Sequence, residues 1–204
     1  TWDISNGVTI IPSTLPINTW HHVAITRSGS TFRTFWNGVQ QATFTSSASI
    51  YQAGNQAFVS RYANGYGLQG AYMSDVRLVK GTSLYNANFT PPTAPLTAVA
   101  NTQLLLSGQN ASIVDSSATT DYQTVTNAQS SSTQYKFGTG SIYLDGSSYA
   151  LSTPSQNLQL GSADFTLEYW IYFNSTTTDR AAVVFGNGAT GYDAIFGYAA
   201  SGGS

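Results

Sequence analysis

The alternation of hydrophobic and polar side chains at every second residue is the feature that most constrains how this chain folds. In HVAITR, residues 22–27, Val23 and Ile25 share one face of an extended strand, and smaller or polar residues take the other. TFRTFW and VQQATFT continue the pattern, and no segment sustains a period of 3.6 residues. The sequence therefore predicts antiparallel β-structure without long helices.

Turn signals join these strands into a meander. Asn37-Gly38 is a strong two-residue hairpin signal, because both residues tolerate the positive φ angles of a type I′ turn. Ser28-Gly29-Ser30 can also reverse the chain. Short strands separated by Gly, Asn, Ser and Pro predict an all-β sandwich or jelly roll. Further strands are expected at 56–62, 71–80, 102–107, 140–146, 149–154, 164–174, 181–187 and 194–200.

Charged groups supply little of the chemistry of this chain. Only 8% of its residues are charged, whereas 41% are hydrophobic and 13% aromatic, and the formal net charge is -2. Such a surface gives little electrostatic attraction to nucleic acid or to anionic membranes. The chain has no cysteine and no apolar run near the ~20 residues of a membrane span, and TWDISNGVTI lacks the regions of a signal peptide. We expect neither nucleic-acid binding nor membrane insertion.

A proline-rich stretch divides the chain near its middle. FTPPTAPLTAV, residues 89–99, holds three of the six prolines, which deny the backbone its ladder donors. We therefore predict a linker at residues 93–100 between two parts, residues 1–92 and residues 101–204.

Several segments carry a family resemblance. GSIYLDGSSYALSTP followed by DFTLEYWIYFN resembles the opening half of a laminin G-like (concanavalin A-like) jelly roll. NTWHHVAITRSGSTFRTFWNGVQQ followed by AYMSDVRLVKGTSLY resembles its closing half. The resemblance implies an antiparallel two-sheet jelly-roll sandwich. Because the closing half comes first, the chain is either a frame cut from a tandem array or one permuted sandwich.

The resemblance also implies a biological setting. Arrays of such domains with the phrase VKGTSLYNANFTPPTAPL look like structural proteins of tailed phages, especially marine ones. The implied function is a non-enzymatic structural or adhesion module of a tail fibre or capsid-surface fibre, on the virion surface or otherwise extracellular. Its implied partners are other virion proteins, copies of itself or host-surface glycans. The alternative is a glycoside hydrolase domain of the concanavalin-like fold.

The acidic and histidine residues argue against catalysis. Glu168 is the only glutamate, and the nearest acid with the same facing on its strand is Asp164, roughly 13 Å along it. Retaining glycosidases need carboxyl groups about 5 to 5.5 Å apart. His21 and His22 are adjacent, so they face opposite sides and do not jointly bind one metal. We expect one to pack beside Trp20 and the other to be solvated, and we expect no enzymatic activity.

Calcium is the one cation that the resemblance allows, because laminin G-like and lectin relatives bind it at loop edges. No resident cofactor is otherwise expected. The acids here lie scattered in loops without a metal-binding motif, and the alternative for turns such as Asp145-Gly146 is capping of the turn by the carboxylate. The candidate ligands are Asp115, Asp145, Asp179 and Asp193.

The aromatic residues divide into an expected core and an expected ligand site. Ligand contact is expected in two loops, residues 62–67 and 187–193, where rings, amides and acids occur beside glycines. The alternative is that these are ordinary turns. The candidate binding residues are Tyr66, Asn64, Tyr192, Asn187 and Asp193. The predicted core residues are Trp20, Val23, Ile25, Trp36, Phe165, Leu167 and Trp170.

Overall fold

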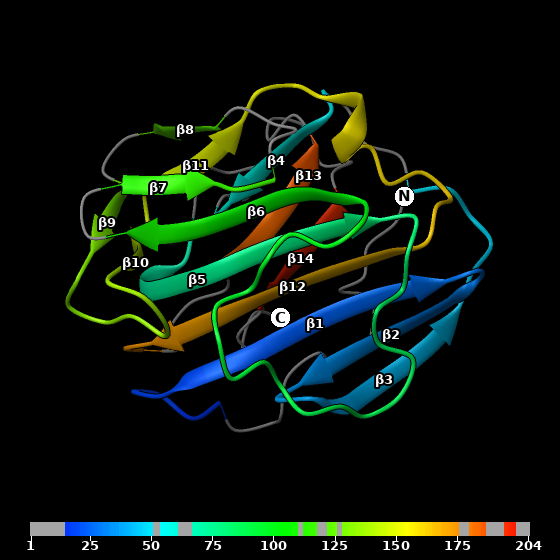
Figure 1. Ribbon diagram of the computed structural model, residues 1–204, viewed down its shortest axis with the longest axis horizontal. Coiled ribbons are helices and arrows are strands. Elements are labelled where there is room, and N and C mark those ends of the chain that lie inside the picture. Colours follow the sequence, from blue (N-terminus) through cyan, green and yellow to red (C-terminus); the bar gives the residue numbers. More distant parts are fainter. Residues whose placement is uncertain are drawn as a thin grey trace, which may run out of the picture.

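Two antiparallel sheets pack face to face in the computed structural model of the chain (Figure 1). The structure describes residues 15–50, 54–60, 67–109, 112–117, 122–125, 128–175, 180–186 and 194–198. Within these residues the only helix is a short 3₁₀ turn, η1 (Gln156–Leu158). The prediction of an all-β, antiparallel two-sheet jelly-roll sandwich is confirmed.

The larger sheet has nine strands in the order β3-β2-β1-β12-β5-β10-β9, with β6 pairing with β5 and β7 pairing with β6. One edge of β5 is shared, because β10 pairs with its first half and β6 with its second half. The strands are β1 (Trp20–Ser28), β2 (Thr31–Trp36), β3 (Val39–Thr45), β5 (Gln69–Lys80), β6 (Thr102–Gln109), β7 (Ser112–Asp115), β9 (Gln129–Ser131), β10 (Ser141–Asp145) and β12 (Phe165–Phe173).

The smaller sheet has five strands in the order β14-β13-β4-β11-β8. They are β4 (Gln56–Val59), β8 (Tyr122–Val125), β11 (Tyr149–Ser152), β13 (Arg180–Gly186) and β14 (Ala194–Tyr198). Three strands were not foreseen, β7, β8 and β9, because they are short and rich in Ser, Thr and Gln. Such segments give little hydrophobic alternation to detect.

Both sheets contain strands from both parts of the chain. In the larger sheet β12, from residues 101–204, lies between β1 and β5 of residues 1–92. In the smaller sheet β4 lies between β13 and β11. Hydrogen bonding across the proposed division is therefore extensive.

The core lies between the sheets and uses alternate residues of each strand. Ile25 on β1 and Phe165 and Leu167 on β12 are fully buried there, and Val59 and Phe185 come from the smaller sheet. The Asn37-Gly38 turn has φ values of 49° and 78°, as its sequence predicts.

Two of the predicted core residues lie elsewhere. Trp170 is buried and Trp20 is partly exposed, but both belong to the opposite face of the larger sheet, which we call the outer face. Their even numbers place them out of phase with Val23, Ile25, Phe165 and Leu167, which do face the core. The prediction of a core position was therefore wrong for Trp20, whereas Trp170 is buried as predicted but on the outer face instead of between the sheets.

Residues 81–100, which we call the strap, lie across the outer face instead of joining another layer (Figure 1). The amide of Leu84 donates to Thr166 Oγ1 at 2.7 Å, and Thr26 Oγ1 donates to the Tyr85 carbonyl at 2.9 Å. The amide of Phe89 donates to the Gly38 carbonyl at 2.9 Å. A Cβ at Gly38 would lie 1.9 Å from the Phe89 carbonyl oxygen, so the turn must carry glycine for the strap to dock.

Candidate functional site

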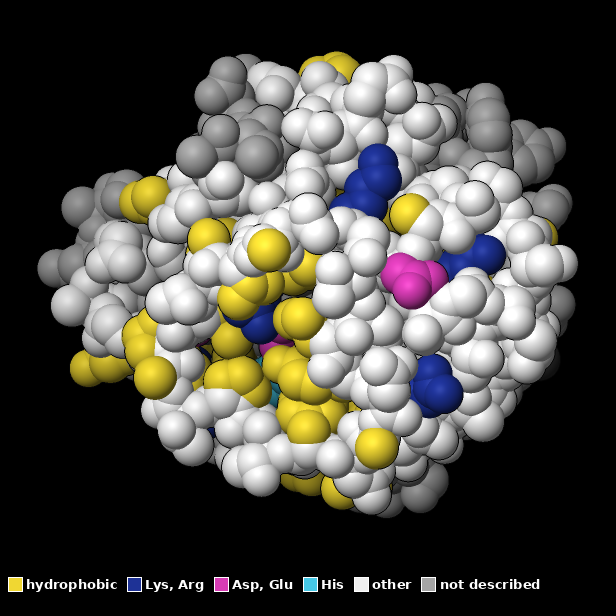
Figure 2. Space-filling view, turned by 45° about the vertical axis from the view of Figure 1, so that its right-hand side comes forward, with side chains coloured by type: hydrophobic (Ala, Val, Ile, Leu, Met, Phe, Trp, Pro, Cys, Tyr) yellow, Lys and Arg dark blue, Asp and Glu magenta, His cyan; other side chains and the backbone are white. Residues whose placement is uncertain are grey.

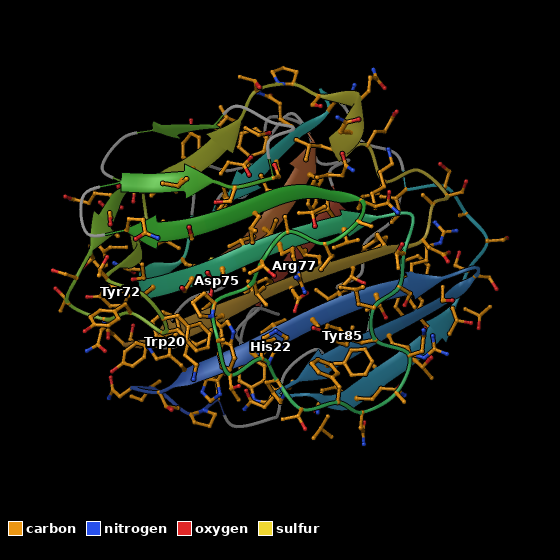
Figure 3. The ribbon with its side chains drawn as sticks, viewed as in Figure 1. Trp20, His22, Tyr72, Asp75, Arg77 and Tyr85 are labelled. Carbon is orange, nitrogen blue, oxygen red and sulfur yellow. The ribbon has the colours of Figure 1, made fainter. Side chains whose placement is uncertain are left out.

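The outer face of the larger sheet gathers most of the described polar and aromatic groups that no core position explains. Figure 3 shows Trp20, His22, Tyr72, Asp75, Arg77 and Tyr85 on this face, contributed by β1, β5 and the strap. Figure 2 shows a hollow rimmed by hydrophobic side chains, with basic, acidic and histidine side chains visible in its depth.

The side chains of His22, Arg77 and Glu168 are buried beneath the strap and, with Tyr85 of the strap, form what we call the buried polar cluster. Arg77 donates to Glu168 Oε1 from Nε at 2.9 Å and from Nη2 at 2.5 Å. Glu168 Oε2 accepts from Tyr85 Oη at 2.9 Å and from His22 Nε2 at 3.2 Å. Because a carboxylate only accepts, His22 Nε2 is the donor in its hydrogen bond with Glu168.

The carboxylate of Glu168 is stabilised by partners within the cluster. Burial alone would raise the pKa of Glu168, but the hydrogen bond from His22 and the charge of Arg77 outweigh burial and hold that pKa below its ordinary value. Burial and the charge of Glu168 raise the pKa of the Tyr85 hydroxyl. Arg77 Nη1 also donates to the Thr97 carbonyl at 2.7 Å, which ties the cluster to the strap.

Asp75 lies beside this cluster at a β-bulge. Glu168 pairs with Arg77 and Trp170 pairs with Ser74, so Asp75 and Val76 together oppose the single residue Tyr169. Asp75 has a φ of 51° and is only 3% exposed. Burial raises the pKa of its carboxyl to about 6, although the Leu96 amide and the charge of Arg77 lower it.

An aromatic row crosses four neighbouring strands at one end of the outer face. Trp20 on β1 pairs with Tyr172 on β12, Tyr172 pairs with Tyr72 on β5, and Tyr72 pairs with Tyr143 on β10. Successive ring centroids are 5.6, 6.0 and 5.0 Å apart. Trp20, Tyr172 and Tyr143 are partly exposed, while Tyr72 is buried between its neighbours. The row spans about 14 Å at ordinary strand spacing.

Both histidines are buried, so the prediction of a solvated histidine was wrong. They face opposite sides of β1, as their adjacency requires. His21 stacks on Trp36 with ring centroids 4.5 Å apart, and its Nε2 donates to the Pro16 carbonyl at 2.9 Å. Burial lowers the pKa of His21, and the Pro16 hydrogen bond partly opposes this shift.

The acids proposed as calcium ligands do not gather in the described structure. Asp145 caps its own turn, accepting from the amides of Ser147 and Ser148 and from both of their hydroxyls. The Ser148 hydroxyl contributes most to lowering the pKa of Asp145 to about 2. Asp115 accepts from the amides of Leu105 and Ser117. Within the described residues, no group of three or more His, Cys, Asp or Glu side chains could hold a metal ion.

The remaining predicted site residues fall outside the described residues. They are Tyr66, Asn64, Tyr192, Asn187, Asp193 and Asp179. Sequence reasoning missed both Asp75 and the aromatic row. The one available signal for Asp75 was its place as the only acid in the predicted strand AYMSDVRLVK, and the row depends on pairing between strands distant in sequence.

Residues 2–84 match the family model of the concanavalin A-like lectin/glucanases superfamily, Laminin_G_3. This match supports the predicted laminin G-like domain over that stretch. No curated protein and no solved structure gives a significant match to the chain. Among the described residues, no helix has the length and apolarity needed to cross a membrane.

Proposed function

We propose that this chain is a non-enzymatic glycan-binding module and that the aromatic row is its binding platform. The observation that carries the proposal is the contact of Trp20, Tyr172, Tyr72 and Tyr143 across four strands, with three of these rings partly exposed on one face. Aromatic rings present apolar faces with large contact area, on which the C–H faces of sugars pack.

The low charge of the chain fits a neutral ligand. Only 8% of its residues are charged, so hydroxyl and amide groups provide most of its surface polarity. Contacts of this kind are individually weak, and they gain strength when many copies act together. Repetition on a virion surface, in a tail fibre or capsid-surface fibre, supplies such copies and is the setting we propose. Its partners there are other virion proteins, further copies of the chain and host-surface glycans.

The geometry of Glu168 favours a structural role over catalysis. Both of its carboxylate oxygens accept hydrogen bonds within the buried polar cluster, and the side chain is 0% exposed. A nucleophile or general base must be free to reach a substrate. We therefore propose that the chain is not an enzyme, needs no resident cofactor and uses calcium only if the loop acids bind it.

One observation favours a glycoside hydrolase as the second candidate. Asp75 has a pKa raised to about 6 and lies close enough to Glu168 for the charge of Glu168 to act on it. A carboxylic acid with a raised pKa near a second carboxylate is what acid catalysis of glycoside cleavage requires. In this function Asp75 would be the acid, and Glu168 would have to leave its hydrogen bonds.

A glycan array probed with a multivalent form of the chain, with and without calcium, tests the proposal. We expect binding that is lost in the double variant Trp20→Ala and Tyr172→Ala. The double variant Tyr66→Ala and Tyr192→Ala is the comparison, because it alters the two loops named from sequence. Loss of binding in the loop variant alone would move the site to the loops.

The enzymatic alternative is tested with the same glycans in solution. Release of reducing ends by the native chain, abolished by Asp75→Asn and by Glu168→Gln, would replace binding with hydrolysis as the function. We expect no release.

A further inference from the structure

Four buried polar atoms on the outer face have no hydrogen-bond partner among the described residues, and they are Trp170 Nε1, Asp75 Oδ2, His22 Nδ1 and Arg33 Nη1. His22 lies beneath Phe89 of the strap, and Arg33 lies on β2, away from the aromatic row. Trp170, which is 5% exposed, and Asp75, which is 3% exposed, lie toward that row. Buried polar groups are almost always paired, so these two orphans on neighbouring strands indicate a site whose partner is missing.

Trp170 and Asp75 belong to a second row of residues beside the aromatic row. His22 pairs with Trp170, and Trp170 pairs with Ser74, which precedes Asp75. This second row is displaced from the aromatic row by two residues, or roughly 6.6 Å, on β1 and β12, and Asp75 lies three residues from Tyr72 on β5. The rings of His22 and Trp170 are 5.0 Å apart. A ligand stacked on the aromatic row would therefore lie beside these atoms.

The segment that follows β9 covers Trp170 of this second row. Lys136 Nζ lies 4.1 Å from the centroid of the Trp170 ring, and the Phe137 ring meets that ring edge-on at 5.8 Å. Lys136 and Phe137 are partly exposed and lie in an irregular segment. Gly138 follows with a φ of 66° and nothing within 4 Å of a built Cβ. Ring contacts of this kind can be exchanged for contacts with a sugar without breaking a strand.

We propose that Trp170 Nε1 and Asp75 Oδ2 form a buried hydroxyl-binding subsite of the glycan platform, which a neutral sugar fills when Lys136 and Phe137 move aside. One sugar hydroxyl donates to Asp75 Oδ2, and another accepts from Trp170 Nε1. This inference rests on the proposed function, since the aromatic row must first hold the glycan.

The surrounding charges select a neutral sugar. Asp75 and Glu168 are matched by Arg77 and Lys136, so the patch has no net charge to attract an ionised ligand. An acidic sugar would meet the Asp75 carboxylate, and an amino sugar would add a cation to acids that Arg77 and Lys136 already match. A hydroxyl group both donates and accepts, so a neutral sugar satisfies one acceptor and one donor without leaving a charge unpaired.

Titration calorimetry with defined oligosaccharides tests the subsite in the intact chain. The probes are neutral hexasaccharides of glucose, mannose and galactose, with hexamers of glucosamine and of galacturonate as the charged counterparts. The test variants are Asp75→Asn and Trp170→Phe. The Trp170→Phe change keeps one aromatic ring and removes the rest of the indole with its N–H group. Their matched controls are Trp36→Phe, on the core face, and Asp145→Asn, in a turn.

We expect a neutral hexasaccharide to bind and both test variants to weaken it by about tenfold or more, with the controls within about twofold of the native chain. Trp20→Ala should abolish binding. If Trp20→Ala abolishes binding while both test variants bind as the native chain does, the subsite is overturned and the proposed function stands. If no probe binds the native chain, the proposed function is overturned and the subsite with it. Preference for a charged hexamer, or ordered waters on the two atoms that persist in the crystallised complex, would also overturn the subsite.

Discussion

The two ends of the outer face satisfy their polar groups in different ways. Beneath the strap, Glu168 receives hydrogen bonds from Arg77, His22 and Tyr85, and the strap, which contributes Tyr85, closes over the other three side chains. Toward the aromatic row, Asp75 Oδ2 and Trp170 Nε1 have no partner among the described residues, and partly exposed rings stand next to them.

This difference indicates that the end beneath the strap serves stability and the end at the aromatic row serves ligand recognition. A buried charge whose partners come from the chain itself commits that end of the face to holding the strap in place. Unpaired polar atoms beside part-exposed rings leave the other end available to a ligand. Substitutions beneath the strap should therefore change unfolding, whereas substitutions at the aromatic end should chiefly change binding.

The largest effect is expected for Arg77→Met. The substitution leaves Glu168 buried without its cation, and breaking a buried ion pair in this way costs about 3 to 5 kcal/mol of unfolding free energy. Urea denaturation followed by tryptophan fluorescence measures it. Lys80→Met is the matched control, because the Lys80 ammonium makes its hydrogen bond at the surface, and it should change stability by less than about 1 kcal/mol. Equal small losses in both variants would refute a structural role for the cluster.

The next effect is a pH dependence that belongs to Asp75. The folded-state pKa is about 6 and the ordinary value is 3.8, so folding takes up a proton between these values. Asp75 therefore makes the protein more stable as pH falls from about 7 to about 4, by at most about 3 kcal/mol, and this gain is lost as pH rises through 6.

Urea denaturation between pH 4.5 and 8 should show this gain in the native chain and not in Asp75→Asn. Asp145→Asn is the control. The pKa of Asp145 is lowered to about 2, so its contribution is lost only as pH falls below about 4, and this variant should keep the native slope between pH 4.5 and 8. A native slope in Asp75→Asn would assign the dependence to another group.

The sequence predicts the inner face of this sheet far better than the outer one. Val23, Ile25, Phe165 and Leu167 were placed in the core because alternation within a single strand determines which residues share a face. The prediction for Trp20 is wrong, and Trp170 is buried on the outer face instead of between the sheets, because both tryptophans take the opposite phase of their strands.

The site depends on information that one strand does not contain. Sequence spacing reveals only the acids on the same strand as Glu168, whereas the carboxyl whose pKa Glu168 affects belongs to Asp75 on β5. That proximity depends on β12 lying between β1 and β5, strands that are about 90 to 145 residues away from it in sequence. It also depends on a β-bulge that no residue pattern in the sequence predicts.

A smaller effect is expected where the strap meets the β2–β3 turn. Gly38→Ala forces a Cβ against the Phe89 carbonyl, whereas Gly29→Ala meets nothing within 4 Å. Both glycines have positive φ, so each variant carries a backbone cost of about 1 to 2 kcal/mol. Thermal unfolding should show Gly38→Ala to be less stable than Gly29→Ala by a further 1 kcal/mol or so, because the strap is displaced. Equal losses would mean that the strap can dock without this contact.

The smallest effect on stability is expected at the aromatic end, for Trp20→Ala. The Trp20 ring is partly exposed and contacts Tyr172 at 5.6 Å, so its removal should cost no more than about 1.5 kcal/mol of unfolding free energy.

Phe35 is the matched residue beneath the strap, because it also lies on the outer face but is fully buried against Phe89, with ring centroids 5.3 Å apart. Phe35→Ala should cost about 3 to 5 kcal/mol and leave glycan affinity unchanged wherever the variant is folded. Trp20→Ala should do the reverse, with near-native unfolding and loss of binding. If the two variants lose affinity in proportion to their loss of stability, the two ends of the outer face are not functionally distinct.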